Sequence, residues 1–260
     1  MVKIGVLLLC VIGCTSPDLF PPGPPETGTT PLGGGEFEDT DPTDPDPTTP
    51  NPPEMLTVQG QLCTVLILNN QTLACNNQGV FVNSDILANG QATVADGDGS
   101  FTATLPPSPS IVYNAVPSSQ EFIPTIIQFP GDDLSPDIPM VRSFEFQDTL
   151  TNLGTVLQVD TAQVILRFVN VNSSQNQSGV FVETIEGGVN VPFYDVQTGV
   201  GWSSNGATGV QGSVLIPNTI VTTPTLTIEY SGDTIDPGAA TILVAPNQIT
   251  FATVFVADPV

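Results

Sequence analysis

The sequence contains no histidine and only three basic residues, Lys3, Arg142 and Arg167, among 260. Without histidine the chain cannot build a Ser-His-Asp or Cys-His hydrolytic centre, nor a histidine-ligated zinc site. Lys3 lies in a segment that we expect to be removed, so Schiff-base and Ser-Lys chemistry are excluded as well. A carboxylate pair such as Glu183 and Glu186 remains, but among 26 acidic residues some pair is expected by chance. The sequence therefore predicts a protein that is not an enzyme.

Positive charge is scarce overall, and the formal net charge is −23 at pH 7. Nucleic-acid binding uses Lys and Arg to replace counterions along phosphates, and peripheral attachment to anionic lipid uses a polybasic segment. We therefore expect no nucleic-acid partner, whereas divalent cations and basic partners stay open. A strongly acidic surface also simply keeps an exported protein soluble.

The apolar run at the N-terminus is short. As a helix, Ile4 to Ile12 would reach about 13 Å, whereas the hydrocarbon core of a bilayer is about 30 Å thick. The run follows Lys3 and ends in small residues, an order that is typical of a secretory signal peptide.

The segment Val11–Cys14, with the sequence VIGC, resembles the lipobox of bacterial lipoproteins. The resemblance implies that residues 1–13 are a lipoprotein signal peptide, that cleavage occurs before Cys14, and that lipid on Cys14 anchors the chain to a membrane. The next residue is Thr15 and not Asp, which favours the outer membrane. A chance cysteine in an ordinary secretory signal is the alternative.

Residues 14–54 are dominated by Pro, Asp, Thr and Gly and have few apolar side chains to bury. Proline removes backbone donors and the carboxylates repel one another, so this composition predicts a disordered linker between the lipidated N-terminus and the body. Its acidic run over residues 39–46 lacks the Gly and the distal Glu of an EF-hand loop.

Two cysteines, Cys63 and Cys75, follow the linker. In an exported chain, an isolated pair that flanks a short loop predicts a disulfide. A reduced pair is the alternative, because sequence alone does not show that the Cα atoms come within bonding range.

From Met55 onwards apolar and polar residues alternate, and Gly, Pro, Asn and Asp clusters separate the alternating runs. We therefore expect an all-β body of two consecutive immunoglobulin- or transthyretin-like β-sandwich domains, at 55–130 and 141–260. Strands of the second domain are expected near Ala162–Val169, Val180–Thr184, Gln211–Ile216, Thr225–Tyr230 and Ile249–Val256.

The two predicted domains repeat short sequences. Gly79–Val82 and Gly179–Val182 both read GVFV, and Gly99–Phe101 is echoed by Gly212–Val214. The echoes indicate an old duplication, although four-residue identities between β sequences also arise by coincidence.

The first domain resembles carboxypeptidase regulatory-like domains. The matching segments are Val58–Gly60, Gly79–Val82, Ala95–Phe101 and Leu105–Pro107. The resemblance covers roughly residues 56–129 and implies a transthyretin-like β-sandwich in which Gly79–Val82 is a strand and Ala95–Phe101 is an acidic turn that leads into an aromatic strand. The loop from Cys63 to Cys75 departs from that pattern.

Candidate ligand-binding side chains are few. Asp96 and Asp98 could bind Ca²⁺ on a small loop, or they simply belong to a Gly-rich hairpin turn. Trp202, in a Gly-rich polar neighbourhood, and Tyr194 are the first candidates for stacking on a sugar ring, and Tyr113 and Tyr230 are further ones.

Together these observations predict a non-enzymatic, lipid-anchored protein of the bacterial cell envelope, without a cofactor, whose β-sandwich domains act as spacer or as interaction module for an envelope protein. A carbohydrate-binding lipoprotein, recognising glycan or peptidoglycan, is one alternative. A calcium-dependent adhesion module is the other.

Overall fold

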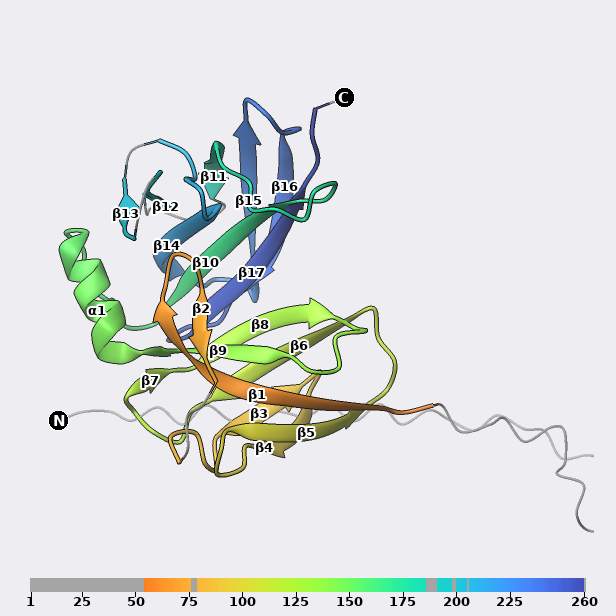
Figure 1. Ribbon diagram of the computed structural model, residues 1–260. Helices are drawn as coiled ribbons and strands as arrows, with labels where there is room; N and C mark the ends of the chain where they lie inside the picture. The colour runs from red at the N-terminus through yellow and green to blue at the C-terminus, as the bar shows by residue number, and fades with distance from the viewer. Residues whose placement is uncertain (1–53, 76–78, 186–190, 198–199, 205, 260) are drawn as a thin grey trace, which may run out of the picture. The chain divides into compact units, whose positions relative to one another are not determined.

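The computed structural model describes residues 54–75, 79–185, 191–197, 200–204 and 206–259 (Figure 1). By its contacts the chain divides into two units, Met1–Asn51 and Pro52–Val260. All described residues belong to the second unit, so the predicted signal peptide, Cys14 and nearly all of the predicted linker lie outside the described residues.

The described residues form seventeen strands and one short helix, which confirms the all-β prediction. In chain order the elements are β1 Leu56–Ile67, β2 Thr72–Ala74, β3 Asp85–Ala88, β4 Gln91–Val94, β5 Ser100–Leu105, β6 Ser110–Val116, β7 Phe122–Ile123, β8 Thr125–Pro130, β9 Asp137–Arg142, α1 Ser143–Asn152, β10 Thr161–Asn170, β11 Val180–Ile185, β12 Phe193–Asp195, β13 Trp202–Ser203, β14 Ser213–Ile220, β15 Thr225–Gly232, β16 Gly238–Leu243 and β17 Ile249–Val256.

The strands build three sheets. One sheet has the order β2-β1-β9-β7, with β5 paired to the first half of β1. A nine-stranded sheet follows the order β13-β12-β14-β10-β17-β8-β6-β3-β4, and β11-β15-β16 form the third. Within the nine-stranded sheet, β17 lies between β10 and β8 and runs parallel to both (Figure 1).

Two sandwiches result, because each smaller sheet covers one part of the nine-stranded sheet. In the first, alternate residues of β1, β5 and β9 meet those of β3 and β6. In the second, β10, β14 and β17 meet β11, β15 and β16. Alternation puts every second side chain into these cores, which is the period that the sequence shows.

A third apolar cluster lies outside both sandwich cores and draws side chains from both. Val65 and Val141 of the first sandwich contact the cluster, as do Ile165, Leu215 and Phe251 of the second. Helix α1 contributes Phe146 and Leu150, which are four residues apart on one helix face and both fully buried.

The chain between the two predicted domains is structured. The boundary predicted between residues 130 and 141 contains β9, which pairs in parallel with β1 and antiparallel with β7. The halves also share the ladder between β17 and β8. The division into two separate domains, at 55–130 and 141–260, stays a prediction.

All five strands predicted in the second half are present within a few residues of the expected bounds. The strand expected at Gly79–Val82 is wrong, because these residues form turns and bends that precede β3. Gly79 has a φ of +77°, and Phe81 projects from this turn into the first core, where it is fully buried. A buried aromatic on a turn produces the same apolar pattern as a strand.

The second sequence similarity, between Gly99–Phe101 and Gly212–Val214, is matched by similar backbone geometry at the two glycines. Both glycines have positive φ, and each accepts a backbone hydrogen bond, Gly99 from Leu62 at 2.9 Å and Gly212 from Phe168 at 2.8 Å. The residue after each glycine begins a strand that is antiparallel to β1 or β10. A Cβ on Gly99 would lie 3.2 Å from the Leu62 oxygen, and one on Gly212 would lie 2.7 Å from the Phe168 oxygen, so glycine is required at both places.

Candidate functional site

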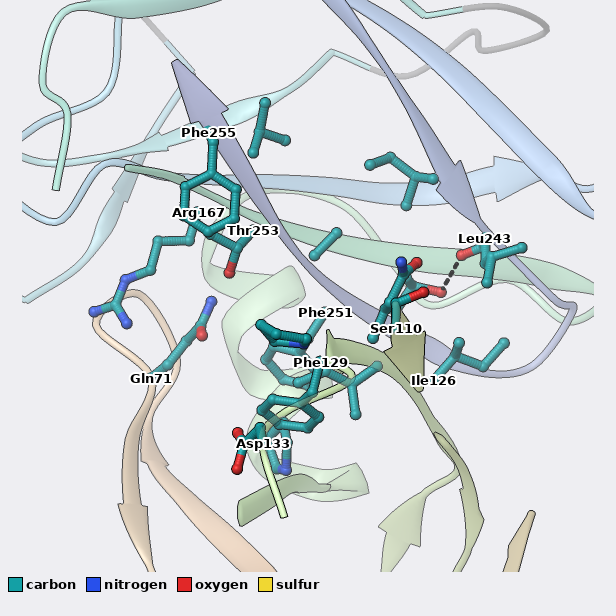
Figure 2. A pocket seen from close by; sticks show the side chains of 18 of the residues that line it. Gln71, Ser110, Ile126, Phe129, Asp133, Arg167, Leu243, Phe251, Thr253 and Phe255 are labelled. Carbon is teal, nitrogen blue, oxygen red and sulfur yellow. Dashed lines mark hydrogen bonds between the residues drawn. The ribbon is translucent and has the colours of Figure 1, made fainter. Parts of the chain in front are cut away.

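A groove of about 770 Å³ opens where β8 and β17 separate (Figure 2). Its lining combines aromatic side chains, among them Phe129, Phe251 and Phe255, with polar ones such as Arg167 and Asp133. The lining is mixed, with ten polar or charged residues among twenty-four, so the groove offers both apolar contact and hydrogen-bonding groups to a bound molecule. We call it the β17 groove.

Arg167 is the basic residue of the β17 groove. It lies in β10, and its Nη2 donates a hydrogen bond of 3.2 Å to the backbone oxygen of Asn70 in the hairpin between β1 and β2. Its Nε is buried and has no hydrogen-bond partner among the described residues. Burial lowers the pKa of Arg167, because the charged guanidinium loses hydration.

Arg142, the other arginine, pairs with Glu145 at 3.3 Å on the surface of α1. Arg167 is therefore the one arginine of the described body for which no ion pair is found. Arg167 was not identified as a candidate site residue from the sequence. The usable signal was an arginine in the middle of the apolar strand sequence AQVILRFVN, since an arginine inside such a strand needs a polar partner or a functional role.

Asp195 is a buried carboxylate that was not identified as a candidate site residue from the sequence. It is 2% exposed at the end of β12. Its carboxylate accepts backbone hydrogen bonds from Gly209, Gln211 and Ser213, at 2.9, 2.8 and 2.8 Å. The carboxylate thus organises the loop that leads into β14, and we assign it a structural role.

Of the four candidate sugar-stacking residues, the three tyrosines are buried and the tryptophan is half-buried. Tyr194 is 5% exposed, and its hydroxyl is 3.1 Å from the Val182 nitrogen, which donates to it. Its ring is therefore not presented at the surface for stacking on a sugar, and a ligand role for Tyr194 stays a prediction. Trp202 is half-buried and packs against the third cluster. Tyr113 and Tyr230 are buried as well.

Asp96 and Asp98 lie in the turn that precedes β5. The Asp98 carboxylate accepts hydrogen bonds from the backbone nitrogen and the hydroxyl of Ser100, at 3.0 and 2.6 Å, and these bonds lower the pKa of Asp98. The Gly99 nitrogen donates to the Asp96 oxygen at 3.0 Å. This geometry is that of a Gly-containing turn with an Asp side chain capping it. Calcium binding by the two carboxylates stays a prediction.

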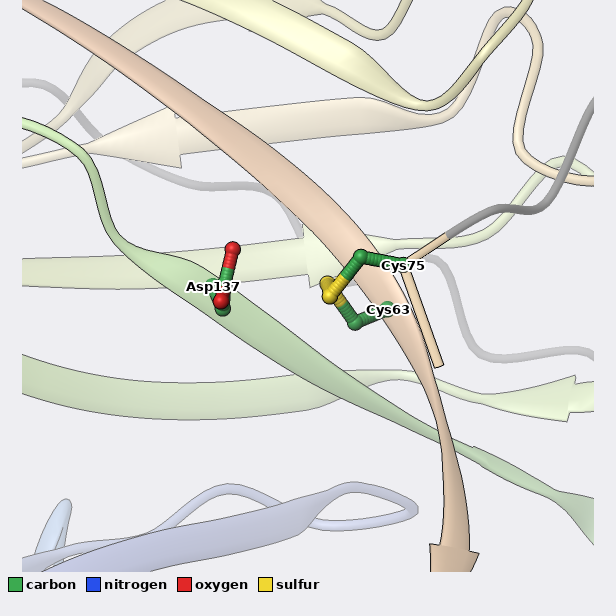
Figure 3. A group of neighbouring side chains, drawn as sticks. All are labelled: Cys63, Cys75 and Asp137. Carbon is green, nitrogen blue, oxygen red and sulfur yellow. A yellow bond between two sulfur atoms is a disulfide. The ribbon is translucent and has the colours of Figure 1, made fainter. Parts of the chain in front are cut away.

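The predicted disulfide between Cys63 and Cys75 is present, with Cα atoms 4.2 Å apart (Figure 3). It ties β1 to the residue after β2. The carboxylate of Asp137 and the two sulfur atoms lie within 4.8 Å of one another. Because the sulfurs are bonded to each other, they are not thiolate ligands, and we assign no metal to this group.

The carboxylate pair Glu183 and Glu186 cannot be assembled from the described residues, because Glu186 lies outside them. Glu183 is exposed on β11 and accepts a hydrogen bond from the Ser231 hydroxyl.

No helix among the described residues has the length and apolar character needed to span a bilayer. The predicted lipidation site, Cys14, lies outside the described residues.

The sequence matches no protein-family model and no curated protein. The resemblance to carboxypeptidase regulatory-like domains therefore stays a prediction.

The solved structures that resemble this chain at low scores include two bacterial pilins and one further bacterial protein. GBS52, the minor pilin of Streptococcus agalactiae, is 11% identical, with 78% of this chain and 96% of that chain covered and a TM-score of 0.28. The shaft pilin SpaA of Lactobacillus rhamnosus GG is 13% identical, with 79% and 99% covered and a TM-score of 0.25. The TIE protein of Bacillus anthracis is 9% identical, with a TM-score of 0.23, and this chain spans about a third of it, 34%. At these scores we draw no functional conclusion from the likeness.

Proposed function

We propose that this protein is a non-enzymatic lipoprotein of the bacterial cell envelope, which displays its β-sandwich body from a membrane and uses it as spacer and interaction module for another envelope protein. The observation that supports the interaction role most directly is the β17 groove, because its lining includes the exposed ring of Phe255 and Arg167, an arginine with no ion pair among the described residues. The observation that supports the anchor is the placement of Cys14 at the end of the apolar run.

A non-enzymatic role is supported by the chemistry of the side chains. The whole chain lacks histidine. The carboxylate of Asp195 is 2% exposed and accepts three backbone hydrogen bonds, so among the described residues it is held inside the protein and not presented to a substrate. Catalytic acids and bases are instead placed in clefts with free access to the reacting atoms.

Acylation is tested by labelling cells that express the full-length chain with radioactive palmitate. We expect incorporation into wild type and none into Cys14→Ser, which should also leave the membrane fraction. Cys10→Ser is the matched control, since Cys10 lies inside the expected signal peptide and should not change labelling. Equal labelling of wild type and Cys14→Ser would overturn the proposal.

The outer membrane is part of the proposal, because Thr15 follows the lipidation site. Density-gradient separation of inner and outer membranes tests it. Recovery of the labelled protein with the inner membrane would overturn this location while leaving acylation intact.

We do not extend the proposal to glycan binding. Its two first candidates were Tyr194, which is buried, and Trp202, which is half-buried against the third cluster. We also do not propose calcium-dependent adhesion, because the Asp98 carboxylate already accepts hydrogen bonds from the backbone nitrogen and the hydroxyl of Ser100.

A further inference from the structure

The two strands next to β17 pair with different numbers of its residues. β10 pairs with all eight residues of β17, from Gln163 opposite Ile249 to Asn170 opposite Val256. β8 pairs only with the first three, and the ladder ends where Phe251 lies opposite Ile127. The second half of β17 therefore has a neighbour on one side only.

The direction of the backbone groups follows from the ladder. In a parallel pair, alternate residues direct their N–H and C=O groups to one neighbour. The nitrogen of Gln163 in β10 donates to the oxygen of Gln248, and that of Val171 donates to the oxygen of Val256, so even-numbered residues of this segment face β10. The nitrogen of Ile249 donates to Pro124, next to β8.

Odd-numbered residues of β17 therefore direct their backbone groups away from β10. Thr253 and Phe255 follow the last β8 pair, so the described residues supply no partner strand for them. Both residues are exposed, Phe255 to 60%. The N–H and C=O groups of these two residues form an open sheet edge, the kind of edge to which an added strand binds.

The β17 groove lies along this open edge. On one side of the sheet, β16 lies across from β17 and is tied to it by a hydrogen bond of 2.9 Å from the Thr250 hydroxyl to the Leu243 oxygen (Figure 2). The small residues Ala240 and Ala252 line the groove there. Small side chains leave room for the apolar side chains of an incoming strand.

On the other side of the sheet, the groove carries Arg167 beside Thr253, its partner in the β10–β17 register. Arg167, Gln71 and Phe255 lie at the same end of the groove (Figure 2). Arg167 has no ion pair within the part of the chain that the structure describes, and beside an open strand edge its guanidinium favours a carboxylate on the incoming segment.

We propose that the β17 groove binds an extended peptide segment of a partner protein, which adds to β17 as a further strand. Its backbone pairs with Thr253 and Phe255. Its alternate side chains are apolar toward Ala240 and Ala252, and one of the intervening side chains is a carboxylate that pairs with Arg167. This inference deepens the interaction role proposed above and rests on it, but it does not depend on the lipid.

The test uses the full-length Cys14→Ser chain and a displayed library of random eight-residue peptides. We expect enrichment of peptides that alternate apolar and polar residues and carry one Asp or Glu. The best synthetic peptide is then measured by fluorescence anisotropy, together with its Gln or Asn analogue. Arg167→Gln should weaken binding of the acidic peptide about tenfold and leave the affinity for the amide analogue unchanged.

Thr253→Pro tests the backbone contact, because proline removes the outward N–H without touching the ladder to β10. We expect binding about tenfold weaker or lost, with Thr253→Val, which keeps the N–H, as matched control. If Thr253→Pro does not fold, the backbone contact can be tested on the wild-type protein with peptides that are N-methylated at every second nitrogen. Only the set whose methylated nitrogens face β17 should bind more weakly.

The proposal would be overturned if no peptides were enriched relative to the same library selected on Thr253→Pro. Equal peptide binding by Thr253→Pro and Thr253→Val, or N-methylated peptides that bind as well as unmodified ones, would overturn it too. A concentration-dependent dimer in sedimentation that Thr253→Pro abolishes would assign the edge to a second copy of this chain and would also overturn it. Palmitate labelling is measured separately, so failure of the groove and failure of the lipid anchor are distinguishable.

Discussion

Tyr113 shows how much a single buried group can contribute. Its side chain is fully buried in the first sandwich, between the rings of Phe101 and Phe129, whose centroids are each 5.9 Å away. Its hydroxyl has no hydrogen-bond partner among the described residues. Burial, with a smaller contribution from Asp133, raises the pKa of Tyr113 to about 12.

The sign of the pH dependence follows from this shift. Above the usual tyrosine pKa of about 10, the unfolded chain loses the proton first and binds fewer protons than the folded chain, so stability falls as the pH rises from 10 to 12. Tyr113→Phe should leave the free energy of unfolding at pH 7 unchanged or raise it by up to about 1 kcal/mol. At pH 11 to 12 the variant should be more stable than wild type by on the order of 2 kcal/mol. Urea titrations at both pH values measure this, and a clear loss of stability at pH 7 would contradict it.

The carboxylate of Asp195 holds three backbone N–H groups of the loop that leads into β14. Asp195→Asn replaces a carboxylate oxygen by an amide nitrogen that faces backbone N–H groups, so we expect a loss of about 2 to 3 kcal/mol. Urea unfolding followed by fluorescence of Trp202, which lies opposite Asp195 in the β12–β13 pair, measures the loss. Asp98→Asn, at an exposed turn, is the control and should change stability far less. Equal effects of the two substitutions would contradict the structural role of Asp195.

At the scale of elements, the hairpin of β1 and β2 covers the third cluster with Leu73 and is held by the disulfide between Cys63 and Cys75. The disulfide closes a loop with a sequence separation of 12. Closing a loop of this size removes chain entropy from the unfolded state.

We expect the double variant Cys63→Ala and Cys75→Ala to lose about 3 kcal/mol of stability. For a body of this size that corresponds to a fall in Tm of roughly 6 to 12 °C, which calorimetry measures. Dithiothreitol should lower the Tm of wild type by a similar amount and leave the variant unaffected. An equal response of both proteins to dithiothreitol would contradict a stabilising disulfide.

At the scale of the whole described unit, β17 and the third cluster join the two sandwiches. Phe251 is buried in that cluster and also ends the ladder with β8. We therefore expect a single cooperative unfolding transition of the two sandwiches.

Phe251→Ala should cost about 3 to 5 kcal/mol and destabilise both sandwiches together. Trp202, the one tryptophan, lies in β13 of the second half and reports on the third cluster against which it packs, and hydrogen exchange of β6 amides reports on the first sandwich. Phe255→Ala, at an exposed position of the same strand, is the control and should have little effect. Protection of β6 that persists after the Trp202 transition would show two independently folding domains.

Much of the fold follows from local pattern. The strands of the second half were predicted within a few residues because alternation of apolar and polar side chains reflects one buried and one exposed face. The cysteine pair was predicted as a disulfide from its spacing and exported character. Gly79–Val82 was mispredicted because a turn that inserts Phe81 into the core has the same apolar composition as a strand.

The site was predicted less well than the fold. Tyr194 was one of the candidates for stacking on a sugar, but it is buried, since aromatic side chains in a β protein mostly face the core. Arg167 and Phe255 lie far apart in sequence, and only the pairing of β10 with β17 brings their strands together.

By itself, the sequence determined the all-β class, the absence of histidine chemistry, the acidic charge and the disulfide pair, because each depends on composition or on neighbours along the chain. Tertiary structure alone decided that the two sandwiches share one sheet and that β8 leaves β17 after three pairs. Strand pairing between distant segments depends on how whole faces pack, and the local alternation of side chains is the same whichever strand lies alongside.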